Sequence, residues 1–142
     1  MSASLSNSLA GTHLVADLQG CQCPRAVLCD AGLLAGHLRS AVREAGLSVV
    51  GETFHKFPDT QAQPGGVTGV VLLAESHVAV HTWPEFGVVT LDVYVCNYSA
   101  DNSPRAEALM DALLALFIPA STCRQAIKRC SVEESRGGAV EP

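Results

Sequence analysis

Three β-rich runs follow one another between residues 67 and 96, and they limit the folds open to this chain. Residues 67–74 are a nearly continuous apolar run, residues 77–82 alternate, and residues 88–96 are rich in valine and other strand-forming side chains. A turn near Glu75-Ser76 and the turn signal Pro84-Glu85-Phe86-Gly87 leave too few residues for a crossover connection. We therefore predict antiparallel hairpins that join these three strands.

The segments before and after these runs predict three more strands and a helix. Strands are expected over residues 13–18 and 47–54, and weak alternation in residues 122–131 indicates a last strand at a sheet edge. Apolar side chains recur at three- and four-residue spacing after Asp30, which is a suitable cap, and predict a helix that runs to about Ala45.

A second helix is expected to open at Ser103, with the serine as its cap, Pro104 in its first turn and Pro119 beyond its end. The order of elements is strand, helix, a series of strands, helix and strand. This order predicts an α+β fold, a two-layer sandwich of a mainly antiparallel sheet with both helices on one face.

Length and charge indicate one domain without a nucleic-acid or membrane partner. The 142 residues carry 48% apolar and 16% charged side chains, which is typical of a globular domain over residues 11–131, with flexible tails at 1–10 and 132–142. The formal net charge is −5, and no basic cluster exceeds Lys128-Arg129, which argues against nucleic acid and anionic lipid.

The six cysteines are interpreted as free thiols of a cytoplasmic protein. The N-terminus has no basic start or long apolar stretch, so no signal peptide is expected, and no apolar run is long enough to span a membrane. A reducing compartment disfavours disulfides. Cys21-Gln22-Cys23 lacks the spacing of a zinc knuckle, and we expect no metal.

Residues 74–85 concentrate the reactive side chains of the chain: two histidines, the only tryptophan, two carboxylates and Ser76. A hydrolase of the Ser-His-Asp type would place such a serine between glycines in a nucleophile elbow, and Ser76 lies between Glu75 and His77. Taken alone, this serine is typical of a turn, and the histidines are typical of partly buried strand residues.

The wider pattern resembles a known family, the short prokaryotic S-adenosylmethionine decarboxylase proenzymes. The resemblance covers roughly residues 11 to 130. It rests on His13-Leu14-Val15-Ala16-Asp17, Phe54-His55-Lys56-Phe57, Gly66-Val67-Thr68-Gly69-Val70-Val71, Glu75-Ser76-His77, His81-Thr82-Trp83-Pro84-Glu85 and Asp92-Val93-Tyr94-Val95-Cys96.

This resemblance implies that the chain cuts itself between Glu75 and Ser76, into a β chain 1–75 and an α chain 76–142. The Ser76 hydroxyl attacks the Glu75 carbonyl to give an ester, and loss of the Ser76 α-proton expels the upstream chain as a carboxylate. The dehydroalanine left behind tautomerises and hydrolyses to a pyruvoyl group and ammonia. By the match, His81 is the proton acceptor in processing, and Thr68 supports it through its hydroxyl.

The resemblance also implies the catalytic roles. The pyruvoyl group made from Ser76 is the cofactor, forms a Schiff base with S-adenosylmethionine and accepts the electrons released with carbon dioxide. Cys96 matches the proton donor. Phe57 and Trp83 match positions that stack the adenine, and Glu85 matches the carboxylate that binds the ribose hydroxyls. The product, decarboxylated S-adenosylmethionine, supplies aminopropyl groups for spermidine.

Two protomers are expected to pair into a four-layer dimer with residues from both chains in each site, again by resemblance. Asn97 stands where relatives usually have glycine, and the loops at 58–66 and 97–104 are longer than usual. These departures leave two alternatives open: a pyruvoyl decarboxylase of a free basic amino acid such as arginine or ornithine, or a non-catalytic regulatory homologue.

The alternation of side chains along a strand limits how Ser76 and His81 can meet. Ser76 and His81 are five residues apart, so on one straight strand they face opposite sides. For the two to meet, Ser76 must lie in the turn or the strand must bulge, and we expect such an irregularity at residues 74–77.

Overall fold

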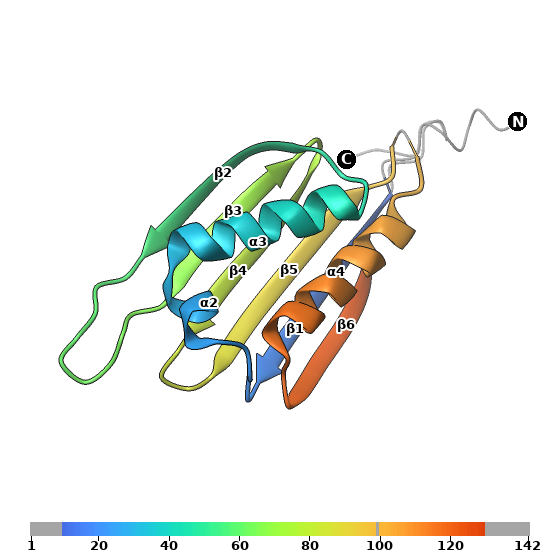
Figure 1. Ribbon diagram of the computed structural model, residues 1–142. Helices are drawn as coiled ribbons and strands as arrows, with labels where there is room; N and C mark the ends of the chain where they lie inside the picture. Colours follow the sequence, from blue (N-terminus) through green and yellow to red (C-terminus); the bar gives the residue numbers. More distant parts are fainter. Residues whose placement is uncertain (1–9, 99, 130–142) are drawn as a thin grey trace, which may run out of the picture.

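The computed structural model describes residues 10–98 and 100–129, and it confirms the predicted α+β sandwich (Figure 1). Six strands form one sheet in the order β2-β3-β4-β5-β1-β6, and every neighbouring pair is antiparallel. The strands are β1 (Gly11–Gln19), β2 (Val49–Lys56), β3 (Val67–Leu73), β4 (Ser76–Trp83), β5 (Val88–Cys96) and β6 (Ser121–Arg129), and the helices are α2 (Arg25–Cys29), α3 (Ala31–Glu44) and α4 (Ser103–Phe117).

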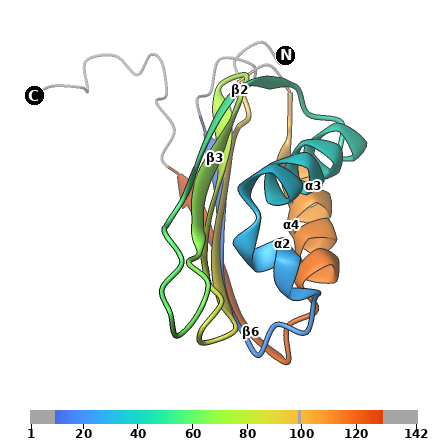
Figure 2. The ribbon, with the colours of Figure 1, turned by 60° about the vertical axis from the view of Figure 1, so that its left-hand side comes forward.

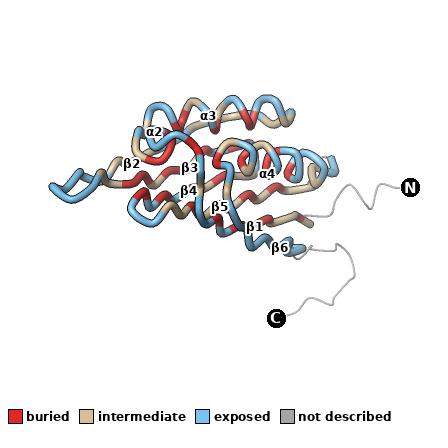
Figure 3. The backbone as a smooth tube through the Cα atoms, turned by 60° about the horizontal axis from the view of Figure 1, so that its bottom comes forward, coloured by how far each residue is buried: buried red, intermediate tan, exposed pale blue. Residues whose placement is uncertain are grey.

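All three helices cover the same face of the sheet, and no helix or strand of the described part covers the other face (Figure 2). Alternate side chains of β1, β3, β4 and β5 point toward the helices and are fully buried, as strand periodicity requires (Figure 3). The largest fully buried side chains of the strands and helices together are Leu14, Leu18, Val67, Val71, Val78, Leu34, Leu38, Val42, Leu109, Met110, Leu113 and Phe117.

The caps of the helices agree with the sequence at one helix and differ at the other. The Asp30 side chain accepts a hydrogen bond from the Leu33 N–H and caps α3, as predicted. The prediction that Ser103 caps α4 is wrong, because Ser103 lies within the helix and Asn102 occupies the cap position. The Ser103 N–H is instead satisfied by the Asp101 carboxylate at 3.0 Å.

No sequence pattern predicted α2, which is only five residues long. A buried threonine anchors this helix: the Thr82 hydroxyl donates to the Leu28 carbonyl at 2.7 Å and accepts from the Val67 N–H at 2.9 Å. The position of α2 therefore depends on a contact between segments that are far apart in the chain. Such a contact produces no periodic pattern in the sequence.

The other element boundaries differ from the predictions by one or two residues. β6 pairs with β1 at the sheet edge, as predicted for that segment, but Cys130 and Ser131 lie outside the described residues. The tails predicted at 1–10 and 132–142 also lie outside them, except for Ala10. No helix of the described part is long and apolar enough to cross a membrane.

Candidate active site

The Glu75–Ser76 bond lies directly after a tight turn at one end of the sheet. Leu73 and Ser76 face each other as the last pair of β3 and β4, so Ala74 and Glu75 form the whole turn. Glu75 has a φ of 66°, in the left-handed region, while Ala74 does not. This combination is typical of a type II turn, whose second central residue is normally glycine. A glutamate there costs roughly 1–2 kcal/mol, and this strain is next to the bond that the resemblance expects to be cut.

Ser76 and Cys96 lie together at this end of the sheet. The Ser76 hydroxyl oxygen accepts a hydrogen bond from the backbone N–H of Cys96 at 3.2 Å, because the last residue of β5 lies beside the first residue of β4. The structure thus brings together two of the three predicted catalytic residues.

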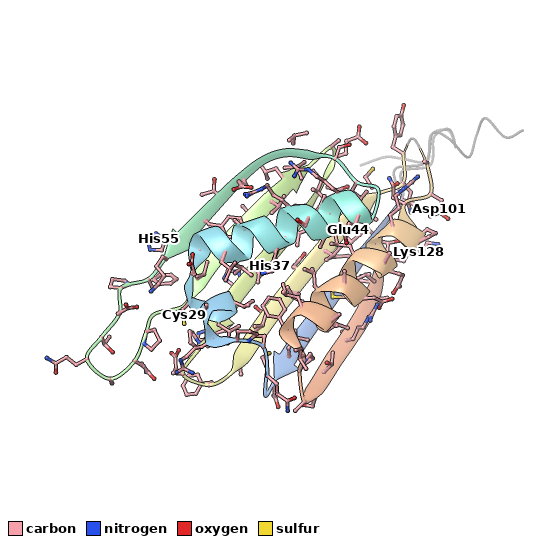
Figure 4. The ribbon with its side chains drawn as sticks, viewed as in Figure 1. Cys29, His37, Glu44, His55, Asp101 and Lys128 are labelled. Atoms are coloured by element: carbon pink, nitrogen blue, oxygen red, sulfur yellow. The ribbon has the colours of Figure 1, made fainter. Side chains whose placement is uncertain are left out.

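A pocket of about 400 Å³ lies at the opposite end of the sheet, between the loop at 57–66 and the β4–β5 turn. Its lining contains all the other predicted site residues: Phe57, Thr68, His81, Trp83 and Glu85. The Thr68 hydroxyl is hydrogen-bonded to His81 Nδ1 at 3.1 Å, and the His81 and Trp83 rings are 6.2 Å apart. In Figure 4, His55 lies near this end and Asp101 near the end that carries Ser76.

The loop at 57–66 is held in shape by one carboxylate. Asp59 Oδ1 accepts from Lys56 Nζ at 2.7 Å and from the Gly65 N–H at 2.9 Å, and Lys56 Nζ also donates to the Phe57 carbonyl. The hydrogen bond from Lys56 is the main reason that the pKa of Asp59 lies below its usual range. The carboxylate therefore stays ionised at all pH values above the ordinary range of aspartate, and the loop loses this support only as the pH falls through the lowered pKa.

The structure does not bring Ser76 and His81 together within one chain. β4 pairs with both neighbours in an unbroken register, so the bulge considered for residues 74–77 does not form; the irregularity is confined to the turn before Ser76. Five residues of strand separate the two side chains by roughly 17 Å. They also belong to opposite rows of β4, because Ser76 shares the row of buried Val78 and Val80 while His81 lies on the uncovered face.

Sequence reasoning missed a polar cluster on the uncovered face, toward the end of the sheet that carries Ser76 and Cys96. Asp92 Oδ1 is 2.6 Å from His13 Nε2 and 3.2 Å from His77 Nε2, and the rings of both histidines contact Tyr94. Each of these residues lies in a motif, but strands β1, β4 and β5 supply them, and only the strand order shows that they meet.

This cluster is satisfied by hydrogen bonds. The three ligand atoms of His13, His77 and Asp92 lie within 4.8 Å of one another, which is close enough for a metal ion. However, Arg129 Nη1 lies 3.2 Å from His13 Nδ1, and a guanidinium only donates. His13 Nδ1 therefore accepts, and its Nε2 carries the proton that is donated to Asp92.

A family model described as S-adenosylmethionine decarboxylase matches residues 12–129, a range that includes both ends of the sheet. The chain belongs to the S-adenosylmethionine decarboxylase family. An S-adenosylmethionine decarboxylase proenzyme of Thermotoga maritima is 39% identical over 105 residues, which cover 74% of this chain and 75% of that protein. The proenzyme of Aquifex aeolicus is 36% identical over 124 residues, which cover 87% of this chain and 84% of that protein.

The fold agrees with a solved member of the family. The crystal structure of the adenosylmethionine decarboxylase from Aquifex aeolicus superimposes with a TM-score of 0.75 at 35% identity, and the match covers 89% of this chain and 96% of that chain. The two-layer architecture of this chain is thus that of an S-adenosylmethionine decarboxylase.

The cysteines of this S-adenosylmethionine decarboxylase differ in their surroundings. Five cysteines of the described part carry free thiols, as predicted. Burial raises the pKa of Cys21 to about 11 and also raises the pKa values of Cys23 and Cys29, so these thiols stay protonated at neutral pH. Cys96 differs from the other four described cysteines because its backbone N–H donates a hydrogen bond to the Ser76 hydroxyl.

Proposed function

We propose that this chain is a self-processing decarboxylase of S-adenosylmethionine that makes its own pyruvoyl group from Ser76. One observation carries the proposal beyond family membership: Ser76 directly follows a left-handed glutamate, and its hydroxyl is in contact with the Cys96 backbone. Self-cleavage requires a strained bond next to a nucleophile, and Cys96, at the same end of the sheet, carries the thiol for the later protonation.

The residues at this point fit a pyruvoyl group. Ser76 supplies the three carbon atoms of the group and water supplies its ketone oxygen, and Cys96 lies on the row of β5 side chains that faces away from the helices. The group supplies a ketone that draws off the electron pair released with carbon dioxide. The chain supplies the rest: the thiol of Cys96 is the general acid that returns a proton to the substrate.

The two ends of the sheet are proposed to act as half-sites. Ser76 and Cys96 form one half-site, and the pocket with Phe57, Thr68 and His81 forms the other, at the far end of β4. Two chains that pair through their uncovered faces about a two-fold axis, with strands running in opposite directions, place the end of the sheet that carries Ser76 and Cys96 beside the pocket of the partner. The Ser76 side chain starts in the row that faces the helices, so we propose that it reaches the partner's pocket through a change at the turn before it. This pairing gives the four-layer dimer expected from the sequence.

Each residue of the pocket then has a role across the dimer interface. His81, held by Thr68, accepts a proton during processing of the partner's serine. Phe57 and Trp83 offer exposed aromatic surfaces for an adenine, at 46% and 38% exposure. Glu85 accepts hydrogen bonds from ribose hydroxyls. Aromatic and acidic groups also suit a sulfonium cation.

Strain at Glu75 is expected to drive self-cleavage. Replacing Glu75 with glycine, which adopts a positive φ without cost, should stabilise the uncut chain and slow its cleavage by about fivefold, the effect of ~1 kcal/mol. Glu75→Ala is the matched control, because it also lacks the carboxylate but keeps the strain. The time course of uncut chain, followed by denaturing gel, compares the two variants. Equal cleavage rates for glycine and alanine would show that strain plays no part.

Asp59 is expected to support substrate binding through the loop. Asp59→Ala removes both hydrogen bonds that hold the loop over the pocket, so KM for S-adenosylmethionine should rise up to about fivefold with little change in kcat. Asp111→Ala is the control, because Asp111 is equally exposed and pairs with Arg124 on another part of the surface. A lower kcat at unchanged KM would contradict this role.

The proposed function is tested by release of labelled carbon dioxide from carboxyl-labelled substrates. The purified protein should act on S-adenosylmethionine and leave arginine and ornithine unchanged. Activity toward a free basic amino acid alone would transfer the proposal to that substrate, and a processed but inactive protein would contradict it.

A further inference from the structure

Cys96 is held by hydrogen bonds on both sides of its backbone. Its N–H donates to the Ser76 hydroxyl at 3.2 Å, and its carbonyl accepts from the Asn102 side-chain Nδ2 at 3.0 Å. Asn102 lies in the loop between β5 and α4. This side chain is therefore the contact that links the loop to Cys96.

The orientation of the Asn102 amide is fixed by its other partner. Arg105 Nη1 donates to Asn102 Oδ1 at 2.7 Å, and because a guanidinium only donates, this atom is the amide oxygen. The amide nitrogen must then point to the Cys96 carbonyl. Arg105 thus prevents the amide from turning over.

Asn102 does not use its side chain for the purpose that its position suggests. An asparagine at a helix cap normally accepts a hydrogen bond from the first turn, worth about 1 kcal/mol. Asn102 is the cap residue of α4 but makes no side-chain cap hydrogen bond, and Asp101 satisfies the Ser103 N–H in its place. The Asn102 side chain makes no hydrogen bond to the helix and instead donates one to the carbonyl of Cys96. This contact indicates a role at the end of β5.

Asn97 connects this arrangement to the rest of the fold. Its Oδ1 accepts from the Asn102 N–H at 2.8 Å, and its Nδ2 donates to the Ser103 hydroxyl at 3.3 Å, which is in turn 2.6 Å from the Thr12 hydroxyl of β1. A glycine at position 97 would offer none of these side-chain contacts. Asn97 therefore forms a polar brace between β1, β5 and α4.

We propose that Asn102, oriented by Asn97 and Arg105, is a positioning residue for Cys96 in this chain. Because the Cys96 N–H contacts Ser76, the brace sets the place of the serine hydroxyl during self-cleavage. Because the same residue carries the thiol, the brace also sets where the proton is delivered. The assignment of these two steps rests on the proposed function, whereas the placement of Cys96 does not.

Asn102→Asp is the most selective test. Aspartate keeps the size of the side chain and its contact with Arg105, but it has no donor for the Cys96 carbonyl and repels that oxygen. Aspartate is also a good cap and favours a helix N-terminus, so the melting temperature should stay the same or rise. Self-cleavage should nevertheless slow by about tenfold, because a hydrogen bond is replaced by repulsion. In the fraction that is processed, kcat should fall while KM stays unchanged, because Asn102 does not line the pocket proposed to bind the substrate.

Asp101→Ala is the matched control. It removes the carboxylate that accepts from the N–H of Ser103, the first residue of α4, so it should lower the melting temperature but leave cleavage and kcat unchanged. A cleavage rate of Asn102→Asp equal to that of the unmodified chain would overturn the proposal, and so would an equal slowing by both variants.

A second measurement separates this proposal from the proposed function. In a Ser76→Ala background, which cannot be processed, Asn102→Ala should free the end of β5 and speed alkylation of Cys96 by iodoacetamide about fivefold, measured on the Cys96 peptide by mass. Asp101→Ala in the same background should not change this rate. If Asn102→Ala speeds the alkylation of Cys96 but the unmodified chain never cleaves, the result supports the proposed positioning of Cys96 and contradicts the proposed self-processing. If the alkylation rate is unchanged, the placement itself is wrong.

Discussion

Ser76→Ala will remain a single uncut polypeptide without decarboxylase activity. Alanine has no hydroxyl to attack the Glu75 carbonyl, so neither the ester nor the pyruvoyl group forms, and the loss of activity should be complete. The folded state should be retained, because Ser76 is only half-buried and its one described hydrogen bond is at the sheet end. Denaturing gel electrophoresis and labelled carbon dioxide release measure the two effects.

The control for this variant is Ser121→Ala, an exposed serine at the start of β6. It should be cut and active like the unmodified chain. A Ser76→Ala chain that still breaks at residue 75, or that still releases carbon dioxide, would show that another residue supplies the reactive group.

Hybrid dimers of Ser76→Ala and Phe57→Ala chains will regain activity that neither parent has. The first chain lacks the reactive serine but has an intact pocket, and the second has the serine but a damaged pocket. If each site combines opposite ends of two chains, one of the two sites in the hybrid is intact, and activity should return to about half that of the unmodified dimer. Differently tagged chains, copurified by both tags, give the hybrid for the measurement.

The same experiment has an internal control. Ser76 and Cys96 belong to the same half-site, so hybrids of Ser76→Ala and Cys96→Ala chains should stay inactive. Recovery in the first pair and none in the second is the pattern that a shared site predicts. Failure of verified Ser76→Ala/Phe57→Ala hybrids to recover would contradict the half-site arrangement.

Strand periodicity and turn residues were sufficient to predict most of the fold. The residues 67–96 form three antiparallel strands joined by short turns, and Asp30 caps α3, because these features depend on neighbouring residues. The short helix α2 and the cap of α4 were not predicted correctly. The helix α2 depends on a contact between segments far apart in the chain, that of Thr82 with Leu28. At the start of α4, the carboxylate of neighbouring Asp101 accepts from the Ser103 N–H, so Ser103 lies inside the helix.

The candidate site was predicted residue by residue but not in its arrangement. Motifs identified Ser76, His81 and Cys96, and periodicity correctly placed Ser76 and His81 on opposite sides of one strand. The sequence did not indicate that β4 continues without a bulge, so the separation of the two half-sites came only from the strand register. The cluster of His13, His77 and Asp92 was missed for the same reason.

The central claim is that Ser76 becomes a pyruvoyl group, and the mass of the purified, denatured protein tests it most directly. We predict two fragments, residues 1–75 and 76–142, the second with a blocked N-terminus that reacts with a carbonyl reagent such as phenylhydrazine. A single chain of 14.8 kDa that persists on long incubation would contradict the claim.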